Sequence, residues 1–392
     1  EFQSQFDFVL QIEPGREYSR RLTRTETPRK KPRTVAVVGA GIAGSSVALA
    51  LCRQGIQVHL YEAAGQPAAG ASGNWVGAFH PHITRGDSPL SRLSRLGFQH
   101  TVAALQALTR KGLMTEGEDW GLPGHLQTVP PDEGDRMQET LKQLDFPTEL
   151  VRWTEPGEFL PTPLGGLFFP QGGWVKPWRW VQANLLACGD LLKLHCNSPL
   201  SEIDRLQSEH DAVVVCCAEQ SLLLAPVPGA QVSMVKGQIS KLRSVQQPGL
   251  VLSGESYAIA PPSEPWMVVG ATYERPVLDL QPTAQADQEN IERFARAFPG
   301  WPLGELLESR CAVRSVWHDR LPAIGPVPNR PGVFMSTGFA SRGLLWAAMG
   351  GWLVADCCLG HALETRLLGR LVPRAARQRP APGNKQADIA DQ

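Results

Sequence analysis

A glycine-rich turn between a short apolar strand and a helix constrains the fold of this chain more than any other feature. Residues 34–38, with the sequence TVAVV, predict a buried strand, and residues 43–54 predict a helix that ends at Gly55. The turn between them, at residues 39–44, reads GAGIAG. A second apolar strand is predicted at residues 56–61, so the segment predicts a right-handed βαβ unit.

The spacing of these glycines is typical of a dinucleotide site. Gly39 permits the tight turn, Gly41 lets the backbone approach a pyrophosphate, and Gly44 lets the helix pack closely on the strand. The N–H groups at the helix N-terminus can bind the anion, and Glu62 can accept hydrogen bonds from ribose hydroxyls. The alternative is a structural turn beside a solvated carboxylate. The predicted binding residues are Gly39, Ala40, Gly41, Ile42, Ala43, Gly44 and Glu62.

Two later loops favour FAD over NAD. The small residues at 70–77 let a bulky ring system lie against the backbone, and the turn at 338–344 leads into an apolar helix. The N-terminus of that helix suits the electron-rich edge of a reduced flavin, although ordinary turn chemistry is the alternative for both loops. The predicted flavin-binding residues are Ala71, Ser72, Gly73, Asn74, Gly77, Gly338, Phe339, Gly343 and Leu344. We expect FAD to be bound non-covalently.

Apolar periodicity predicts the remaining elements. Helices are expected at residues 90–111, 178–186, 287–298 and 344–357. Strands are expected at residues 211–217, 231–242, 257–260, 266–271 and 332–337. The glycine- and proline-rich segment 117–170 predicts strands and loops.

Composition excludes several classes of protein. The chain has 38 basic and 38 acidic residues, so its overall charge gives no argument for nucleic acid, and the basic segment 16–33 is interpreted as a solvated linker. No apolar stretch approaches the length of a membrane span, and the eight cysteines lack the spacing of a metal site. We therefore expect a cytoplasmic protein without a metal. The absence of an initial methionine suggests a fragment of a longer chain.

Over residues 34–372 the chain resembles the FAD-dependent D-amino-acid oxidase and glycine oxidase superfamily. The motifs that carry the resemblance are VAVVGAGIAG, GASGNWVGAFHP, GESYAIAP, VVGATYERP, RCAVRSVWHDRLPAIGP and GFASRGL. GASGN and the SRGL turn are most similar to the oxidoreductase half of the MnmC family of bifunctional tRNA-modification enzymes.

The resemblance implies an α/β fold with an α+β insert. Its Rossmann-like FAD-binding domain would be of the glutathione-reductase and D-amino-acid-oxidase type, beside a mostly antiparallel substrate-binding domain. The FAD-binding domain would comprise residues 34–90, 171–230 and 311–372. The substrate-binding domain would comprise residues 91–170 and 231–310, with a tail or linker at 1–33 and a disordered tail at 373–392.

The resemblance also implies a reaction on CH–NH groups. The substrate would be 5-carboxymethylaminomethyl-(2-thio)uridine at the tRNA wobble position, converted to the 5-aminomethyl form by hydride transfer to flavin and imine hydrolysis, with molecular oxygen as electron acceptor. The family's methyltransferase half is absent here, so it would lie on a longer or separate chain. Two alternatives are a small-molecule glycine, sarcosine or D-amino-acid oxidase and a catalytically silent FAD-binding module that interacts with tRNA.

Three catalytic candidates follow from the resemblance. Arg314 matches the family's carboxylate-binding arginine, with an ion pair to Asp319 as the structural alternative. Tyr257 would assist with the same carboxylate, and Arg342 would meet the substrate or the flavin edge. Outside this set, two histidines lie beside the first flavin loop, and a tryptophan-rich run at 174–180 could stack a nucleobase or simply begin a packed helix.

Overall fold

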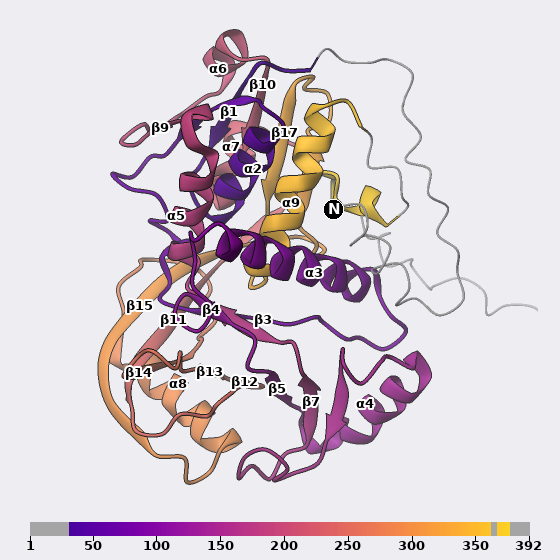
Figure 1. Ribbon diagram of the computed structural model, residues 1–392, viewed down its shortest axis with the longest axis vertical. Helices are drawn as coiled ribbons and strands as arrows, with labels where there is room; N and C mark the ends of the chain where they lie inside the picture. The colour runs from indigo at the N-terminus through magenta and orange to yellow at the C-terminus, as the bar shows by residue number, and fades with distance from the viewer. Residues whose placement is uncertain (1–30, 362–366, 377–392) are drawn as a thin grey trace, which may run out of the picture.

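The chain forms two layers, each built on its own β-sheet, in a computed structural model that describes residues 31–361 and 367–376 (Figure 1). The expectations for the tails at 1–30 and 377–392 lie outside the described residues. Within the described part, no helix combines the length and the apolar character needed to cross a membrane.

The first layer contains a six-stranded sheet in the order β16-β17-β10-β1-β2-β9. All neighbouring strands are parallel except β16 and β17, which pair antiparallel. Its strands are β1 (Thr34–Val38), β2 (Gln57–Tyr61), β9 (Leu192–His195), β10 (Ala212–Val215), β16 (Ala323–Pro326) and β17 (Val333–Thr337). Apart from the partly buried Thr34, strands β1 and β10 consist of buried apolar residues, as expected for a parallel sheet covered on both faces.

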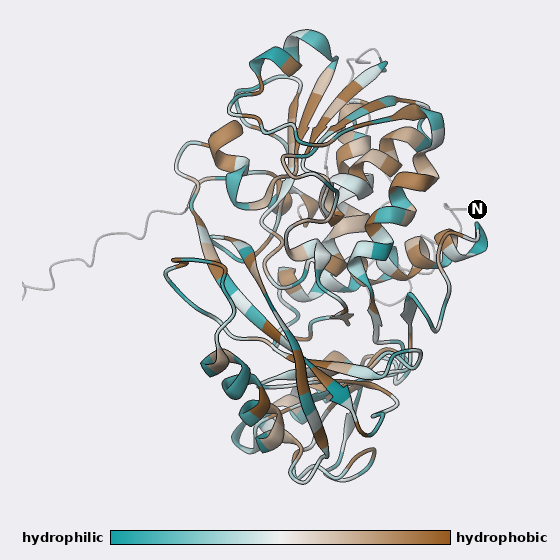
Figure 2. Cartoon of the chain, turned by 90° about the vertical axis from the view of Figure 1, so that its left-hand side faces the viewer, coloured by the Kyte–Doolittle hydropathy of each residue, from teal (hydrophilic) through white to brown (hydrophobic). Residues whose placement is uncertain are grey.

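Long helices lie on one side of this sheet, either directly on its strands or on the helices that cover them. They are α2 (Ile42–Arg53), α3 (Pro89–Arg110), α5 (Pro177–Cys188) and α9 (Gly343–Cys358). Helix α9 packs against both α2 and α3. A Cβ added at Gly351 would lie 2.5 Å from the Ser46 carbonyl oxygen, and one at Gly97 would lie 2.4 Å from that of Leu345. These glycines therefore let the helix backbones touch, and Figure 2 shows the apolar residues concentrated on the strands and helices of this layer.

The opposite face of the six-stranded sheet has a smaller apolar cluster. It includes Ala36 and Val38 of β1, and the buried ring of Trp317. Two short helices lie in this part of the chain, α6 (Asp204–Glu209) and α7 (Ser221–Leu224).

The second layer contains an eight-stranded, mostly antiparallel sheet in the order β15-β11-β14-β13-β12-β5-β7-β6, in which only β12 and β5 pair in parallel. Its strands are β5 (His125–Thr128), β6 (Arg152–Thr154), β7 (Gly166–Phe169), β11 (Val232–Ser244), β12 (Val251–Ser253), β13 (Tyr257–Ile259), β14 (Trp266–Gly270) and β15 (Leu303–Trp317). Helix α8 (Ala284–Ala297) packs on β11 and β14, and α4 (Pro131–Leu144) lies beside β6.

A three-stranded sheet stands between the two layers. It consists of β3 (Gly77–Phe79), β8 (Gly173–Val175) and β4 (Trp120–Gly121), in the order β3-β8-β4. Short 3₁₀ helices occur at Ala71–Gly73 (η1), Gly189–Leu191 (η2), Ala218–Gln220 (η3) and Leu368–Leu371 (η4).

The expected fold class is confirmed. The structure differs from the sequence-based expectations in segments whose apolar residues show little periodicity. The segment 117–170, expected to hold strands and loops, also contains α4. That helix buries only Thr140, so it lacks the broad apolar stripe that identifies a helix in sequence. The domain boundaries remain a proposal, from which two elements depart: α3 packs on α9 of the first layer, and β15 pairs with β11 from residue 303 onward.

Gly44 lies so close to the Gly39 backbone that adding one methyl group at position 44 should lower the stability of the protein. A Cβ at Gly44 would lie 1.8 Å from the Gly39 carbonyl oxygen, so the backbone of Gly44→Ala must move. We expect its melting temperature to fall by about 5 °C or more, because overpacking against backbone costs about 3 kcal/mol. Gly70→Ala is the matched control, since an added Cβ there meets no atom within 4 Å. Equal melting temperatures for the two variants would contradict this account.

Candidate functional site

The turn between β1 and α2 places a glycine at the helix N-terminus, where an anion can bind to backbone N–H groups. Gly39 has a φ of +99°, and a Cβ there would lie 2.8 Å from the Cys216 carbonyl oxygen. Helix α2 has no side-chain cap, since its N-cap residue is Gly41. Within the part of the chain that the structure describes, the only side chain bonded to its first N–H groups is that of Ser72, whose hydroxyl accepts from Ile42 N at 2.9 Å. This hydroxyl occupies the kind of position that a phosphate oxygen takes at such an end.

Glu62 is fixed directly after β2. Its Oε2 accepts a hydrogen bond from Ala40 N at 2.8 Å, and its Oε1 accepts one from Ala64 N at 2.9 Å. Each carboxylate oxygen has more than one lone pair, so both can still accept from ribose hydroxyls. The backbone bonds orient the carboxylate beside the glycine-rich turn, which fits an adenosine ribose.

The first flavin loop is held by an arginine that the sequence analysis missed. Arg310, on β15, donates from Nε to Asn74 Oδ1 at 3.2 Å and from Nη2 to the Gly70 carbonyl oxygen at 3.0 Å. A Cβ at Gly73 would lie 2.7 Å from the Arg310 Nη2 atom. The small residues of this loop therefore admit a guanidinium from the other layer. Its position four residues before Arg314, in the same RCAVR motif, was the available signal.

The second flavin turn also meets β15. Gly338 and Ala340 have φ values of +72° and +51°, and Ala340 N donates to the Ser315 carbonyl oxygen at 2.9 Å. Helix α9 then begins at Gly343, and a Cβ at Gly77 of β3 would lie 2.8 Å from the Leu344 Cδ1 atom. The two loops predicted to contact the flavin, far apart in sequence, thus lie together at the N-terminus of α9.

These features fit FAD. Glycines leave backbone exposed where a bulky ligand must approach, helix N-termini at α2 and α9 face the same region, and a fixed carboxylate stands where a ribose is expected. The binding roles of the individual residues remain proposals.

Arg314 projects from β15 across the neighbouring strand. A Cβ at Gly237 of β11 would lie 2.4 Å from the Arg314 Nη1 atom, so glycine makes room for the guanidinium. Nη1 donates to the Thr272 carbonyl oxygen at 3.1 Å, and the guanidinium carbon lies 4.5 Å from the centre of the Tyr273 ring. Asp319, the alternative partner, pairs instead with Arg374. Among the described residues, no carboxylate forms an ion pair with Arg314, so its charge is available to a ligand.

Tyr257 begins β13 and is half-buried. Burial raises the pKa of its phenol to about 12, and the charge of Arg314 acts in the opposite direction. Tyr257 therefore stays protonated near neutral pH and can donate a hydrogen bond close to Arg314.

Arg342 is the residue before α9, and burial lowers the pKa of its guanidinium. Its positive charge also affects the pKa of two histidines near the first flavin loop. Burial lowers the pKa of His80 and of His82 to about 4, and the charge of Arg342 contributes to both shifts. The His80 ring also packs 4.1 Å from that of His125. Both His80 and His82 are therefore neutral near pH 7, which agrees with leaving them outside the catalytic set.

The tryptophan-rich run is mostly core. Trp174 and Trp180 are 2% and 0% exposed, and α5 begins at Pro177. Trp180 thus belongs to a packed helix start, and Trp174 is a core residue of β8. Of the tryptophans in this run, only Trp178, at 37% exposure, can meet a nucleobase.

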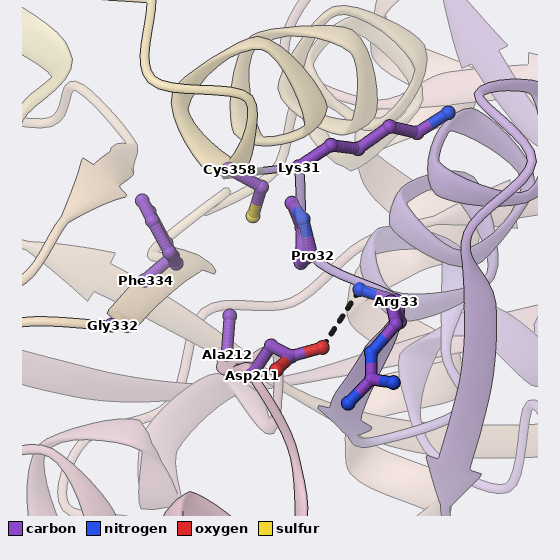
Figure 3. A pocket seen from close by; sticks show the side chains of 8 residues that line it. All are labelled: Lys31, Pro32, Arg33, Asp211, Ala212, Gly332, Phe334 and Cys358. Atoms are coloured by element: carbon purple, nitrogen blue, oxygen red, sulfur yellow. Dashed lines mark hydrogen bonds between the residues drawn. The ribbon is translucent and has the colours of Figure 1, made fainter. Parts of the chain in front are cut away.

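A hollow elsewhere in the first layer does not compete with this site. It is lined by Lys31, Pro32, Arg33, Asp211, Ala212, Gly332, Phe334 and Cys358 (Figure 3). Arg33 N donates to Asp211 Oδ2 across it at 2.7 Å. It lies where β1, β10 and β17 begin, whereas ligands of open parallel sheets bind at the carboxyl ends of the strands.

Comparison with known proteins agrees with the geometry. Residues 34–357 match the family described as DAO, FAD dependent oxidoreductase. Two proteins named tRNA 5-methylaminomethyl-2-thiouridine biosynthesis bifunctional protein MnmC, from Thiobacillus denitrificans and Burkholderia multivorans, are each 31% identical to this chain and cover 87% and 86% of it. The chain spans 59% and 58% of those two relatives, or about three fifths of their length.

Solved structures share the fold. Glycine oxidase from Geobacillus kaustophilus has a TM-score of 0.77 at 22% identity, covering 88% of this chain and 99% of that one. Iminodiacetate oxidase from Chelativorans sp. has a TM-score of 0.72 at 23% identity, covering 88% and 100%. The expected resemblance and the expected cofactor are thus confirmed, and this chain belongs to the DAO family of FAD-dependent oxidoreductases.

Proposed function

We propose that this chain oxidises the carboxymethylaminomethyl group at position 5 of a tRNA wobble uridine, leaving the aminomethyl group and releasing glyoxylate. The observation that carries the proposal is Arg314, whose guanidinium lies over the Tyr273 ring and has no carboxylate partner among the described residues. It is also close enough to Tyr257 for its charge to act on the pKa of that phenol. The substrate side chain is an N-substituted glycine, whose carboxylate suits that guanidinium. The names of the MnmC relatives support tRNA as its carrier.

The residues divide the work of binding and orientation. Arg314 would bind the carboxylate through its planar fork, and the protonated Tyr257 would donate to the same group. Arg342, close to the start of α9, would add positive charge where the anionic substrate enters. When bound, FAD supplies the two-electron acceptor for oxidation of the C–N bond. Water then adds to the substrate imine and splits it into aminomethyl uridine and glyoxylate. Molecular oxygen would accept the electrons afterwards.

A small-molecule oxidase of the glycine or sarcosine type shares the same carboxylate requirement. The fold likeness to glycine oxidase, at 22% identity, supports it less than the MnmC relatives, at 31% identity, support the tRNA substrate. The property that discriminates between the two is the size of the substrate. A methyltransferase half, supplied on a longer or separate chain, would complete the modification only in the tRNA case.

The first test identifies the substrate. Purified protein loaded with FAD is incubated with tRNA hypomodified at the carboxymethylaminomethyl stage, and wobble nucleosides are analysed by mass spectrometry. We expect loss of the carboxymethyl nucleoside and gain of the aminomethyl form, with little peroxide from free glycine. Robust peroxide from glycine without change in the tRNA would establish the small-molecule alternative. No flavin bleaching with either substrate under anaerobic conditions would indicate a silent module.

Arg314 provides the second test. Arg314→Ala should raise KM for the modified tRNA by about 100-fold or more, because two charge-assisted hydrogen bonds of about 1.5–3 kcal/mol each are lost. Arg314→Lys keeps the positive charge but not the planar guanidinium, so its KM should lie between those of the wild type and of Arg314→Ala. Arg243→Ala is the matched control, since it removes an exposed guanidinium of β11 that pairs with Glu305. An Arg314→Ala enzyme with unchanged KM would disprove the carboxylate assignment.

The pH dependence of kcat/KM forms a third test. The substrate amine must be neutral to lose a hydride, so kcat/KM should rise with pH as that amine deprotonates. His82, with its pKa near 4, is already neutral above about pH 5, and Tyr257, with its pKa near 12, remains protonated. His82→Gln should therefore leave the midpoint of the profile unchanged. A shifted midpoint in this variant would show that His82 takes part in proton transfer.

A further inference from the structure

A large exposed aromatic residue lies beside Arg314 of the candidate site. Tyr273 follows β14 in the GATYERP motif and is 63% exposed. A single exposed aromatic residue on a surface is ordinary. Here the ring contacts the Arg314 guanidinium, which the preceding proposal assigns to substrate binding.

The backbone on both sides of Tyr273 is fixed to β11. Thr272 N donates to the Gln238 carbonyl oxygen at 3.2 Å, and Gln238 N donates to Thr272 Oγ1 at 3.0 Å. On the other side, Glu274 N donates to the Lys236 carbonyl oxygen at 2.9 Å. The ring is therefore carried on a strand-like segment rather than on a free loop.

The segment beyond Tyr273 is held by a buried lysine. Lys236 is 4% exposed, and its Nζ lies 3.3 Å from carboxylate oxygens of both Glu274 and Asp279. The same Nζ donates to the Gln281 carbonyl oxygen at 2.9 Å. A rigid aromatic platform loses little conformational entropy when a ligand stacks on it.

The charges around the ring exceed the needs of a glycine-like substrate. Arg314 suffices for one carboxylate. A further arginine, the exposed Arg320, lies close enough to the half-buried Arg342 for its charge to lower the pKa of that guanidinium, although burial is the larger cause. No ion pair of Arg320 or Arg342 occurs within the described residues. A second anionic group on the ligand, such as a nucleotide phosphate, would be accommodated there.

We propose that Tyr273 is a nucleobase-stacking platform. Arg314 lies on one side of its ring, and a base of the RNA stacks on the ring while the carboxymethyl group of the modified uridine reaches Arg314. The stacked base is that of the modified uridine or of an adjacent nucleotide. The inference rests on the proposed function and adds to it the contact that distinguishes an RNA nucleotide from a free amino acid. Single-stranded RNA is recognised in this way, by unstacked bases that lie on aromatic side chains. The leucines of the same segment, Leu278 and Leu280, are exposed but offer no π face.

The test compares Tyr273→Ala and Tyr273→Phe with Leu278→Ala, which removes a side chain of the same segment that is 86% exposed. Each FAD-loaded variant is titrated with an anticodon stem-loop RNA carrying the carboxymethylaminomethyl uridine, and fluorescence anisotropy gives Kd. Each is also titrated with glycolate, a carboxylate without a base, and the flavin absorbance spectrum reports binding. Turnover of the stem-loop by the wild type is measured in parallel.

We expect Tyr273→Ala to weaken RNA binding by about 5- to 150-fold, which corresponds to a stacking energy of about 1–3 kcal/mol per base. Tyr273→Phe and Leu278→Ala should bind like the wild type, and glycolate affinity should be unchanged in all three. Equal RNA affinity in Tyr273→Ala and Leu278→Ala would overturn the inference, as would a parallel loss of glycolate affinity, since Tyr273 would then act only by placing Arg314.

The two proposals fail in different ways. A wild type that turns over the stem-loop while Tyr273→Ala binds it normally refutes only the platform. A wild type that binds the RNA through Tyr273 but leaves the modified uridine unchanged refutes only the reaction. A wild type that does not bind the RNA refutes the platform as well as the tRNA substrate.

Discussion

The pairing of β15 with β11 is the interaction on which the candidate site depends. β15 runs over residues 303–317 and pairs with β11 from Val232 to Ser244, so a single strand extends along the substrate sheet and reaches the nucleotide layer. Its last residue, Trp317, is fully buried in the apolar cluster under the six-stranded sheet, and a Cβ at Gly338 would lie 3.3 Å from the Trp317 Cβ. The strand thereby fixes the two layers relative to each other.

Side chains alternate between the two faces of β15, and this alternation places its two site arginines on one face. Arg310 and Arg314 are four residues apart without an intervening bulge, so they point to the same face, about 13 Å apart along the strand. The first holds the flavin loop near Gly73 and the second lies over the Tyr273 ring, while the Ser315 carbonyl oxygen accepts from Ala340 of the second flavin turn. A register shift of one residue would separate all three contacts, which makes the strand pairing a condition for the site.

The parts of this arrangement that sequence could predict are local. The turn from β1 to α2 and the start of α9 follow from glycine spacing and apolar runs, because each depends on neighbours within a few residues. Arg310 was missed because its partners, Gly70 and Asn74, lie some 240 residues earlier, and no spacing rule links such segments. Helix α4 was missed because it is largely exposed. Strand β15 was missed because its first half, LGELLES, alternates poorly and lies at the edge of its sheet. Arg314 came from family resemblance rather than from pattern, and the structure adds the glycine at position 237 that makes room for it.

The arginines of the candidate site lack carboxylate partners within the described residues. Arg342 is half-buried and Arg314 lies across a sheet, and neither has a carboxylate partner within the described residues. Removing a charge from water without a partner costs free energy, and burial accordingly lowers the pKa of Arg342. An anionic ligand that pairs with these guanidinium groups recovers part of that cost, so binding and folding are coupled in this region. The protein could have neutralised Arg314 with Asp319, five residues along the chain, but that carboxylate is bound by Arg374 instead. Keeping Asp319 occupied elsewhere leaves the Arg314 guanidinium open to the anionic substrate that we propose. Burial raises the pKa of the Tyr257 phenol to about 12 against the opposing charge of Arg314, so Tyr257 remains a neutral donor.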